Sequence, residues 1–249
     1  MNSPLSTSSS RRIPCNAGLL ELIRSRRESH WKPSPKELQK GFRGWHQRGY
    51  LPHFDAPDVI QLVTFMLSDA FPIQRRIEWE AVLHEPDSSL RRRKLEAWLD
   101  RGYGECWLGR EPIAALVQRV LLQGNQRDYG LVAWCIMANH VHVIVSVWTV
   151  SLSHLVQKWK GASAVEANQI LGRQGRFWQE DYFDTLVRND RHLKQAVRYV
   201  EENPCKARLA LDPRDWRWSS ARVRDEWNRL PWEQSTDWNG DLNPVAGPN

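Results

Sequence analysis

Two histidines separated by one residue are the first side chains in this sequence whose spacing could do chemistry. His140 and His142 follow the apolar run 131–137. Successive side chains of a β-strand point to opposite faces, so the two imidazoles would point the same way, with Val141 turned toward a core. Two neutral imidazoles on one face could bind a metal ion, but a complete metal site would need further ligands from elsewhere in the chain. Because such a pair also occurs on ordinary surfaces, a second segment is needed to make the pattern specific.

A helix expected from 189 or 190 to 203 offers that second segment. Tyr199 and Asn203 are four residues apart, so they stack on one side of this helix, at the edge of its apolar stripe. A phenol, with a pKa of roughly 10, needs a base, a cation or a metal-polarised electrophile before it can act as a nucleophile. A divalent ion held by the two imidazoles and the Asn203 oxygen would polarise a phosphodiester. On spacing alone, Tyr199 is better interpreted as an ordinary tyrosine at the edge of a helix than as a nucleophile.

Composition limits the class of protein. The 249 residues include 14 tryptophans, enough for a large core in one domain with appendages. A net charge of +6 favours a polyanionic partner, of which nucleic acid is the first candidate. The four cysteines are widely spaced, as in reduced cytoplasmic proteins. Residues 1–14 lack the apolar centre of a secretion signal, and no run approaches the ~18 apolar residues of a membrane span. We therefore expect a cytoplasmic protein with no membrane partner.

Cations and aromatic residues alternate in the segment 24–48. It contains Arg43 and Arg48, with Trp45 between them. Cations neutralise phosphates and aromatic rings stack on unpaired bases, so the segment suits a single-stranded nucleic acid. The alternative is a solvated arm whose aromatic residues hold it to the domain. Its prolines predict an extended, irregular chain.

The elements expected beyond this arm alternate between strand and helix. We predict strands over 59–67, 131–137, 140–148 and 177–187, and helical spacing over 74–100, 111–121, 153–171 and 190–203, with Pro204 ending the last helix. The charge run 91–94 is typical of a solvated helix face, and a contact with phosphate is the less common alternative. Lys158 and Lys160 could face nucleic acid or could be ordinary surface and core neighbours. The order of elements predicts an α+β sandwich with one antiparallel sheet.

Several blocks of this sequence resemble one known family. Residues 137–144, Met-Ala-Asn-His-Val-His-Val-Ile, resemble the histidine motif of the single-tyrosine HUH transposases of the insertion-sequence 200/605 type. Within that group, the sequence is most similar to the REP-associated tyrosine transposases. The blocks that support this are 43–55, 99–104, 177–184, 198–204 and 216–221. The resemblance implies a ferredoxin-like α+β core in which helices pack on one antiparallel sheet.

The resemblance also implies a role for each residue that matches the family motifs. His140 and His142 fall on the metal-binding histidines, and Tyr199 falls on the nucleophile. Asn203 falls on a third ligand, which is commonly glutamine in the insertion-sequence branch. The metal would be Mg²⁺ or Mn²⁺, of which Mn²⁺ suits imidazole better. Ala138 stands where the motif usually has proline, which removes no ligand.

In this family, the tyrosine attacks single-stranded DNA near a hairpin and leaves a 5′-phosphotyrosine bond and a free 3′-hydroxyl. We therefore predict a metal-dependent DNA endonuclease and strand transferase, a transposase, that acts as a monomer or homodimer. The predicted DNA contacts are Arg43, Arg48, Lys158 and Lys160. Tyr182 is a rival nucleophile, but its expected strand offers no amide four residues away on the same face. The alternatives are a domesticated hairpin-binding protein without cleavage and a metal-dependent nuclease that uses water.

The predicted organisation has four parts. They are a disordered tail over 1–18, the basic arm over 19–57, the transposase-like domain over 58–222 and a C-terminal tail over 223–249. The tail either packs back on the domain or is disordered; its sequence is compatible with both.

Overall fold

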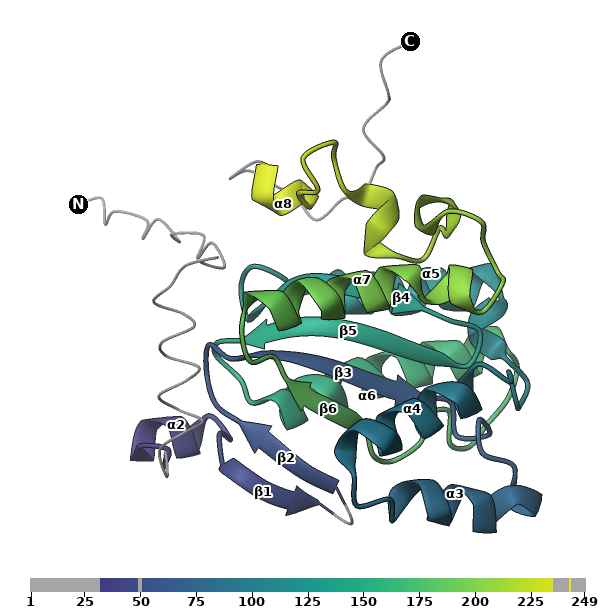
Figure 1. Ribbon diagram of the computed structural model, residues 1–249, viewed down its shortest axis with the longest axis horizontal. Coiled ribbons are helices and arrows are strands. Elements are labelled where there is room, and N and C mark those ends of the chain that lie inside the picture. Colours follow the sequence, from purple (N-terminus) through teal and green to yellow (C-terminus); the bar gives the residue numbers. More distant parts are fainter. Residues whose placement is uncertain (1–31, 49–50, 235–241, 243–249) are drawn as a thin grey trace.

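The computed structural model of this protein describes residues 32–48, 51–234 and 242. Four strands in these residues form one antiparallel sheet in the order β4-β5-β3-β6 (Figure 1). They are β3 (Ile60–Met66), β4 (Tyr129–Ile136), β5 (His140–Val147) and β6 (Phe183–Leu186). Helices follow β3, β5 and β6, which gives the βαββαβ arrangement of ferredoxin-like folds. The predicted α+β class with a ferredoxin-like core is confirmed.

Helices cover both faces of this sheet, and strand alternation decides which side chains meet them. On one face, Val141, Val143 and Val145 pack with α5 (Glu111–Leu122) and α6 (Leu152–Ile170). On the other face, Ile144 packs with α7 (Asp190–Lys206). His140 and His142 have the parity of Ile144, so their side chains lie on the face that α7 covers.

Two further helices complete the α7 face of the sheet. The expected helical region 74–100 divides into α3 (Arg76–Leu83) and α4 (Ser88–Leu99). Pro86 stands in the break, where it disfavours helical backbone in the residue before it. Leu95 and Leu99 of α4 are buried in one cluster with Met66 at the end of β3. Since Met66 pairs with His140, α4 lies over the part of the sheet that holds the histidines.

The N-terminal segment is more regular than its prolines predict. A short helix, α2 (Pro35–Gln39), begins with a capping box between Ser34 and Glu37, and an antiparallel hairpin of β1 (Gly44–Arg48) and β2 (Leu51–Asp55) follows. The Trp45 and Phe54 rings contact each other across the hairpin, with their centroids 4.9 Å apart. A two-stranded sheet tolerates proline in β2 because one edge of each strand needs no ladder partner. The predicted irregular chain is therefore wrong over 35–39, 44–48 and 51–55. The predicted tail 1–18 and the arm residues 19–31 lie outside the described residues.

Two predicted boundaries near the site also change. The strand expected over 177–187 is regular only from Phe183 to Leu186, although Trp178 forms an isolated bridge with Leu67. Helix α7 continues through Pro204 to Lys206. Proline has a helix-compatible φ, and its missing N–H removes one bond without stopping the turn that follows. The Ala207 N–H still donates to the Asn203 carbonyl at 3.0 Å. Pro204 thus fails to end the helix.

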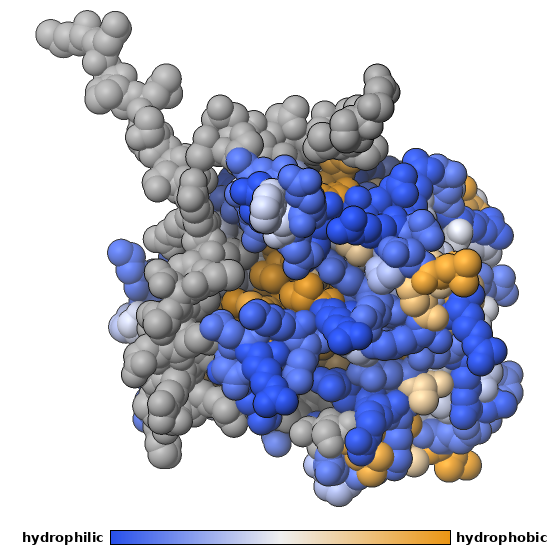
Figure 2. All heavy atoms as spheres, turned by 45° about the horizontal axis from the view of Figure 1, so that its top comes forward, coloured by the Kyte–Doolittle hydropathy of each residue, from blue (hydrophilic) through white to orange (hydrophobic). Residues whose placement is uncertain are grey.

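The beginning of the C-terminal tail packs back on the domain. Leu230 and Trp232 are buried. Trp232 belongs to the short helix α8 (Pro231–Gln234), and its ring stacks on that of Trp134 with the centroids 5.9 Å apart. Residues 235–241 and 243–249 lie outside the described part. The face in Figure 2 is largely hydrophilic, with apolar side chains in small patches. No helix in the described part is long and apolar enough to cross a membrane.

Candidate active site

The two histidines of β5 turn their Nε2 atoms toward each other. His140 and His142 are 1% and 2% exposed, and their Nε2 atoms are 3.1 Å apart. His140 Nδ1 lies 2.7 Å from the Asn139 Oδ1, which can only accept, so Nδ1 carries the ring proton. The Asn139 amide is itself fixed, since its Nδ2 donates to the Leu99 and Tyr103 carbonyls. The His140 Nε2 therefore has a free lone pair.

His142 reaches the same tautomer through a different neighbour. Its Nδ1 lies 2.8 Å from the Thr64 hydroxyl on the paired strand β3. The Asn203 Nδ2, a donor, lies 3.3 Å from the His142 Nε2. A nitrogen that accepts from an amide carries no proton, so the proton is on Nδ1 and donates to Thr64. The unprotonated Nε2 atoms of both imidazoles thus face the same buried space.

Burial keeps these imidazoles neutral. Desolvation lowers the pKa of His140 well below its usual value, helped by the neighbouring His142. Desolvation also lowers the pKa of His142 to about 3, with further contributions from the charges of Arg92 and Lys206. Neutral imidazole is the form that binds a metal ion.

Helix α7 brings the two residues predicted at four-residue spacing to the same place. The Tyr199 hydroxyl lies 3.4 Å from the His142 Nε2, and the two rings meet edge to face with centroids 5.3 Å apart. Asn203, 4% exposed, lies one turn further along. The Asn203 Oδ1 is buried and has no hydrogen-bond partner within the described residues. The structure thus brings together all four residues that the sequence singled out: His140, His142, Tyr199 and Asn203.

These side chains fit a divalent metal ion. Ligands about 2.1 Å from a six-coordinate ion lie about 3 Å apart in neighbouring positions, close to the 3.1 Å between the two Nε2 atoms. Two lone pairs facing at this distance repel each other unless a cation lies between them. A rotation of the Asn203 amide would exchange its Nδ2, which lies 3.3 Å from the His142 Nε2, for its buried Oδ1, an oxygen of the kind that Mn²⁺ accepts as a ligand. Within the described residues, no group of three or more His, Cys, Asp or Glu side chains is placed to hold a metal ion.

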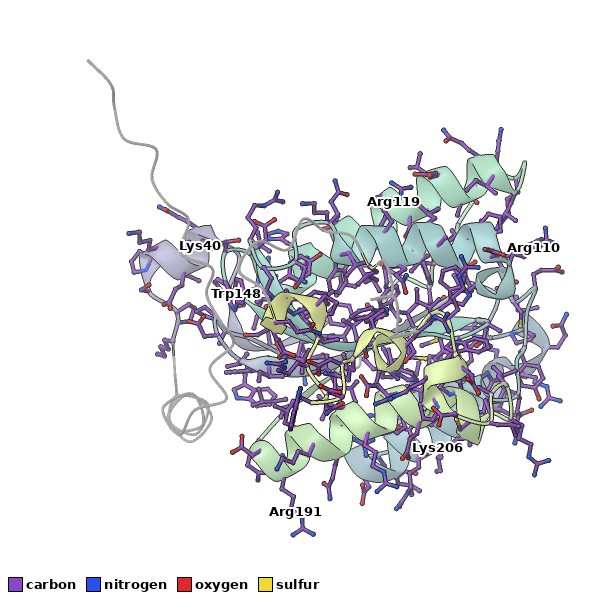
Figure 3. The ribbon with its side chains drawn as sticks, turned by 90° about the horizontal axis from the view of Figure 1, so that it is seen from above. Lys40, Arg110, Arg119, Trp148, Arg191 and Lys206 are labelled. Carbon is purple, nitrogen blue, oxygen red and sulfur yellow. The ribbon has the colours of Figure 1, made fainter. Side chains whose placement is uncertain are left out.

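Charged side chains that sequence reasoning missed surround Tyr199. Burial raises the pKa of Tyr199, and the charge and hydrogen bond of the Glu96 carboxylate raise it further. The Arg92 guanidinium and the Lys206 ammonium lie 5.9 and 4.9 Å from the centroid of the Tyr199 ring. Lys206 is the last residue of α7, and Arg191 lies near the other end of this helix (Figure 3). Arg92 belongs to the charge run 91–94, whose composition alone indicated a solvated face.

The predicted DNA contacts lie at different places. Arg43 and Lys158 are exposed. Arg48 lies in β1, and its side chain is outside the described structure. The Lys160 ammonium donates to the carbonyls of Gln179, Glu180 and Asp181, at 3.0, 3.1 and 2.8 Å, so it has a structural role in the chain before β6. DNA binding by these four residues remains a prediction.

The rival nucleophile, Tyr182, packs elsewhere. It is 2% exposed, and its ring lies 4.8 Å from that of His53 in β2. His53 in turn pairs with Asp184 of β6. Tyr182 therefore lies at the junction between the hairpin and the sheet. Of the two candidate tyrosines, Tyr199 is the one whose ring contacts His142.

Comparison with known proteins matches the segment that holds the site. Residues 113–203 match the family model described as "Transposase IS200 like". A Haemophilus influenzae protein named "Putative REP-associated tyrosine transposase" is 24% identical over 103 residues, which cover 37% of this chain and 58% of the relative. The match therefore spans little more than half the length of this relative.

Two solved structures are also similar. One is a REP-associated tyrosine transposase bound to a REP hairpin, with 16% identity and a TM-score of 0.44 over 81% of this chain and 94% of that one. The other is a crystal structure described as a "putative transposase" from Deinococcus radiodurans, with 15% identity and a TM-score of 0.31 over 64% of this chain and 96% of that one.

Proposed function

We propose that this chain, a member of the IS200-like transposase family through residues 113–203, is a metal-dependent single-strand DNA endonuclease and strand transferase. The observation that carries the proposal is the position of Tyr199. Its hydroxyl lies 3.4 Å from the unprotonated Nε2 of His142, which itself lies 3.1 Å from the unprotonated Nε2 of His140. A potential nucleophile thus lies beside three side chains that could hold a metal ion.

His140, His142 and Asn203 would hold the ion. When bound, Mg²⁺ or Mn²⁺ supplies Lewis acidity that polarises a phosphodiester and stabilises the charge that develops on it. Tyr199 is half-buried, with the His142 ring, the Arg92 guanidinium of α4 and the Lys206 ammonium at the end of α7 near its ring. These neighbours would hold the phenol beside the metal ligands.

The proposed reaction exchanges one phosphoester bond for another, so no phosphoester is lost to hydrolysis. The Tyr199 oxygen forms a bond to phosphorus, the bond from phosphorus to the 3′-oxygen breaks, and the phenolic proton leaves as the 3′-hydroxyl gains one. The product is a 5′-phosphotyrosine, which a 3′-hydroxyl can attack in reverse to join strands without an external energy source. The exposed Arg43 and Lys158 are candidates for phosphate contacts, because exposed cations neutralise the backbone of DNA. We propose single-stranded, hairpin-bearing DNA as the substrate.

A covalent adduct distinguishes this function from its rivals. Purified protein and a Tyr199→Phe variant would be incubated with end-labelled single-stranded DNA that carries the hairpins flanking its gene, with Mn²⁺ or Mg²⁺. We expect a denaturant-resistant protein–DNA band for the unsubstituted protein, absent with the variant and with chelator. Cleavage that persists in Tyr199→Phe without an adduct would indicate a nuclease that uses water. Hairpin binding without cleavage under either ion would indicate a domesticated DNA-binding protein.

A further inference from the structure

Two cations from different helices lie near the ring of Tyr199. The Arg92 guanidinium of α4 and the Lys206 ammonium of α7 are 5.9 and 4.9 Å from the centroid of this ring. Both distances are shorter than the screening length of roughly 8 Å at physiological salt. The two side chains are 45% and 50% exposed, so a ligand in solvent can reach both. Because the attacking hydroxyl belongs to this ring, the cations can act on an anion that approaches it.

Lys206 lies on the face of α7 that carries the site. It follows Tyr199 by seven residues and Asn203 by three, a spacing that puts side chains on one side of a helix. Its ammonium lies 3.8 Å from one Glu202 carboxylate oxygen, which is too long for a hydrogen bond. The nearer partner of Glu202 is Arg198, whose Nε lies 2.6 Å from the other oxygen. Glu202 therefore leaves the donors of the Lys206 ammonium free to bind another anion.

Arg92 continues the buried face of α4 to the point where that face meets solvent. It precedes Leu95 by three residues and Leu99 by seven, and both leucines are buried. The neighbouring Arg93 lies off this stripe and is exposed. The Arg92 Nε pairs with the Glu96 Oε1 at 3.2 Å, which engages only part of the guanidinium. The terminal amino groups of Arg92 can therefore bind the oxygens of a phosphate.

We propose that Arg92 and Lys206 form a binding site for the DNA phosphate that Tyr199 attacks. This proposal rests on the proposed role of Tyr199 as nucleophile. A phosphodiester carries its negative charge on two non-bridging oxygens, and attack on phosphorus adds charge to them. A guanidinium binds two such oxygens at once, while an ammonium acts as a point charge.

The rival interpretation is that both cations only pack on the Tyr199 ring. Packing alone predicts that removal of either charge lowers thermal stability and leaves DNA binding unchanged. A phosphate site predicts a change in the salt dependence of DNA binding, because each cation that binds a phosphate displaces counterions from the DNA.

The test removes or retains each charge in the full chain. Arg92→Gln and Lys206→Gln remove the charges, and Arg92→Lys and Lys206→Arg retain them. Arg93→Gln is the control on α4, and Arg198→Gln, which removes a side chain that is 78% exposed, is the control on α7. The affinity of each protein for hairpin-bearing single-stranded DNA is measured at a series of NaCl concentrations. A chelator prevents metal-dependent cleavage during these measurements, and thermal stability is measured in parallel.

We expect Arg92→Gln and Lys206→Gln each to reduce the slope of log affinity against log salt by about 0.7, the value for one phosphate contact on a single strand. The charge-retaining variants should restore most of this slope, and both control variants should match the unsubstituted protein. Unchanged slopes in Arg92→Gln and Lys206→Gln, with or without a loss of thermal stability, would overturn the proposal. Equal reductions in these variants and in both controls would also overturn it, since they would indicate a diffuse effect of charge.

A second experiment locates the phosphate. Once the cleaved bond has been mapped, a neutral methylphosphonate replaces either the phosphate at that bond or one several nucleotides away. The replacement at the cleaved bond should weaken binding by the unsubstituted protein but not by the double variant Arg92→Gln/Lys206→Gln, whereas the distant replacement should affect both proteins equally. Equal sensitivity of the two proteins at the cleaved bond would contradict the proposed site.

Adduct formation separates this proposal from the proposed function. With Mn²⁺, we expect Arg92→Gln and Lys206→Gln each to slow single-turnover adduct formation about 10- to 100-fold, as for a lost hydrogen bond to a charged group. If the unsubstituted protein forms an adduct but neither variant changes the salt slope, the phosphate site fails and the proposed function stands. If no adduct forms but these two variants alone reduce the slope, the proposed function fails and Arg92 and Lys206 remain a site for DNA phosphate.

Discussion

Glu201 should be far more important for stability than Glu202, its neighbour on α7. The Glu201 Oε1 accepts from the Ser220 hydroxyl and from the Arg224 Nε, both at 2.6 Å. The Glu201 and Arg224 side chains are 12% and 6% exposed, and Arg224 also donates to the Val132 carbonyl of β4 at 2.7 Å. This buried network ties the helix that carries Tyr199 and Asn203 to the C-terminal segment.

Burial sets the size of the expected effect. Glu201→Ala leaves the Arg224 cation buried without an anionic partner, which costs about 3–5 kcal/mol of the free energy of unfolding. Glu202 pairs with Arg198 at the same 2.6 Å, but the Arg198 side chain is 78% exposed. Such a pair contributes about 0.3–0.5 kcal/mol. In a protein of this size, Glu201→Ala should lower Tm by about 6–20 °C, at 2–4 °C for each kcal/mol.

Urea unfolding followed by tryptophan fluorescence measures both variants against the unsubstituted protein. The double variant Glu201→Ala/Arg224→Ala should be less destabilised than Glu201→Ala alone, since it contains no orphaned charge. Equal losses for Glu201→Ala and Glu202→Ala would refute the argument that burial, rather than distance, decides the strength of these pairs.

Three further changes test the metal site and a buried carboxyl. Asn203→Ala should weaken Mn²⁺ binding, while Asn203→Gln retains it, as measured by calorimetry; equal binding by all three proteins would exclude the amide as a ligand. Thr64→Val removes the partner that fixes the His142 ring and should weaken Mn²⁺ binding about 10- to 100-fold; unchanged affinity would argue against this orientation. Burial raises the pKa of Asp55, so the folded state binds its proton more tightly than the unfolded state does. Stability should fall as pH rises from ~4 through this raised pKa, and Asp55→Asn should remove that loss in urea unfolding at a series of pH values; identical pH profiles would contradict it.

Local periodicity put each pair of candidate site residues on one face, and the resemblance to a known family joined the two pairs into one expected site. Alternation in a strand puts His140 and His142 on one face, and a spacing of four puts Tyr199 and Asn203 on one side of a helix. These relations depend on few residues, and the structure brings both pairs together. The order of strands and helices likewise predicted the fold class, although Pro204 failed to end α7.

Relations between distant segments could not be derived in this way. Arg92 lies near the Tyr199 ring because Leu95 and Leu99 anchor the same helix, α4, in the core, and this helix ends far before Tyr199 in the chain. The run 91–94 alone does not show which of its arginines faces the site. Lys160 similarly looked like an available cation, but the carbonyls that occupy its ammonium belong to residues 179–181.

The most direct test of the central claim identifies the residue that carries the DNA. Protein reacted with hairpin-bearing single-stranded DNA and Mn²⁺ would be digested with protease and nuclease and analysed by mass spectrometry. The account predicts a nucleotide linked through its 5′-phosphate to the peptide that contains Tyr199. A nucleotide on the peptide that contains Tyr182, or cleaved DNA with no modified peptide, would contradict it.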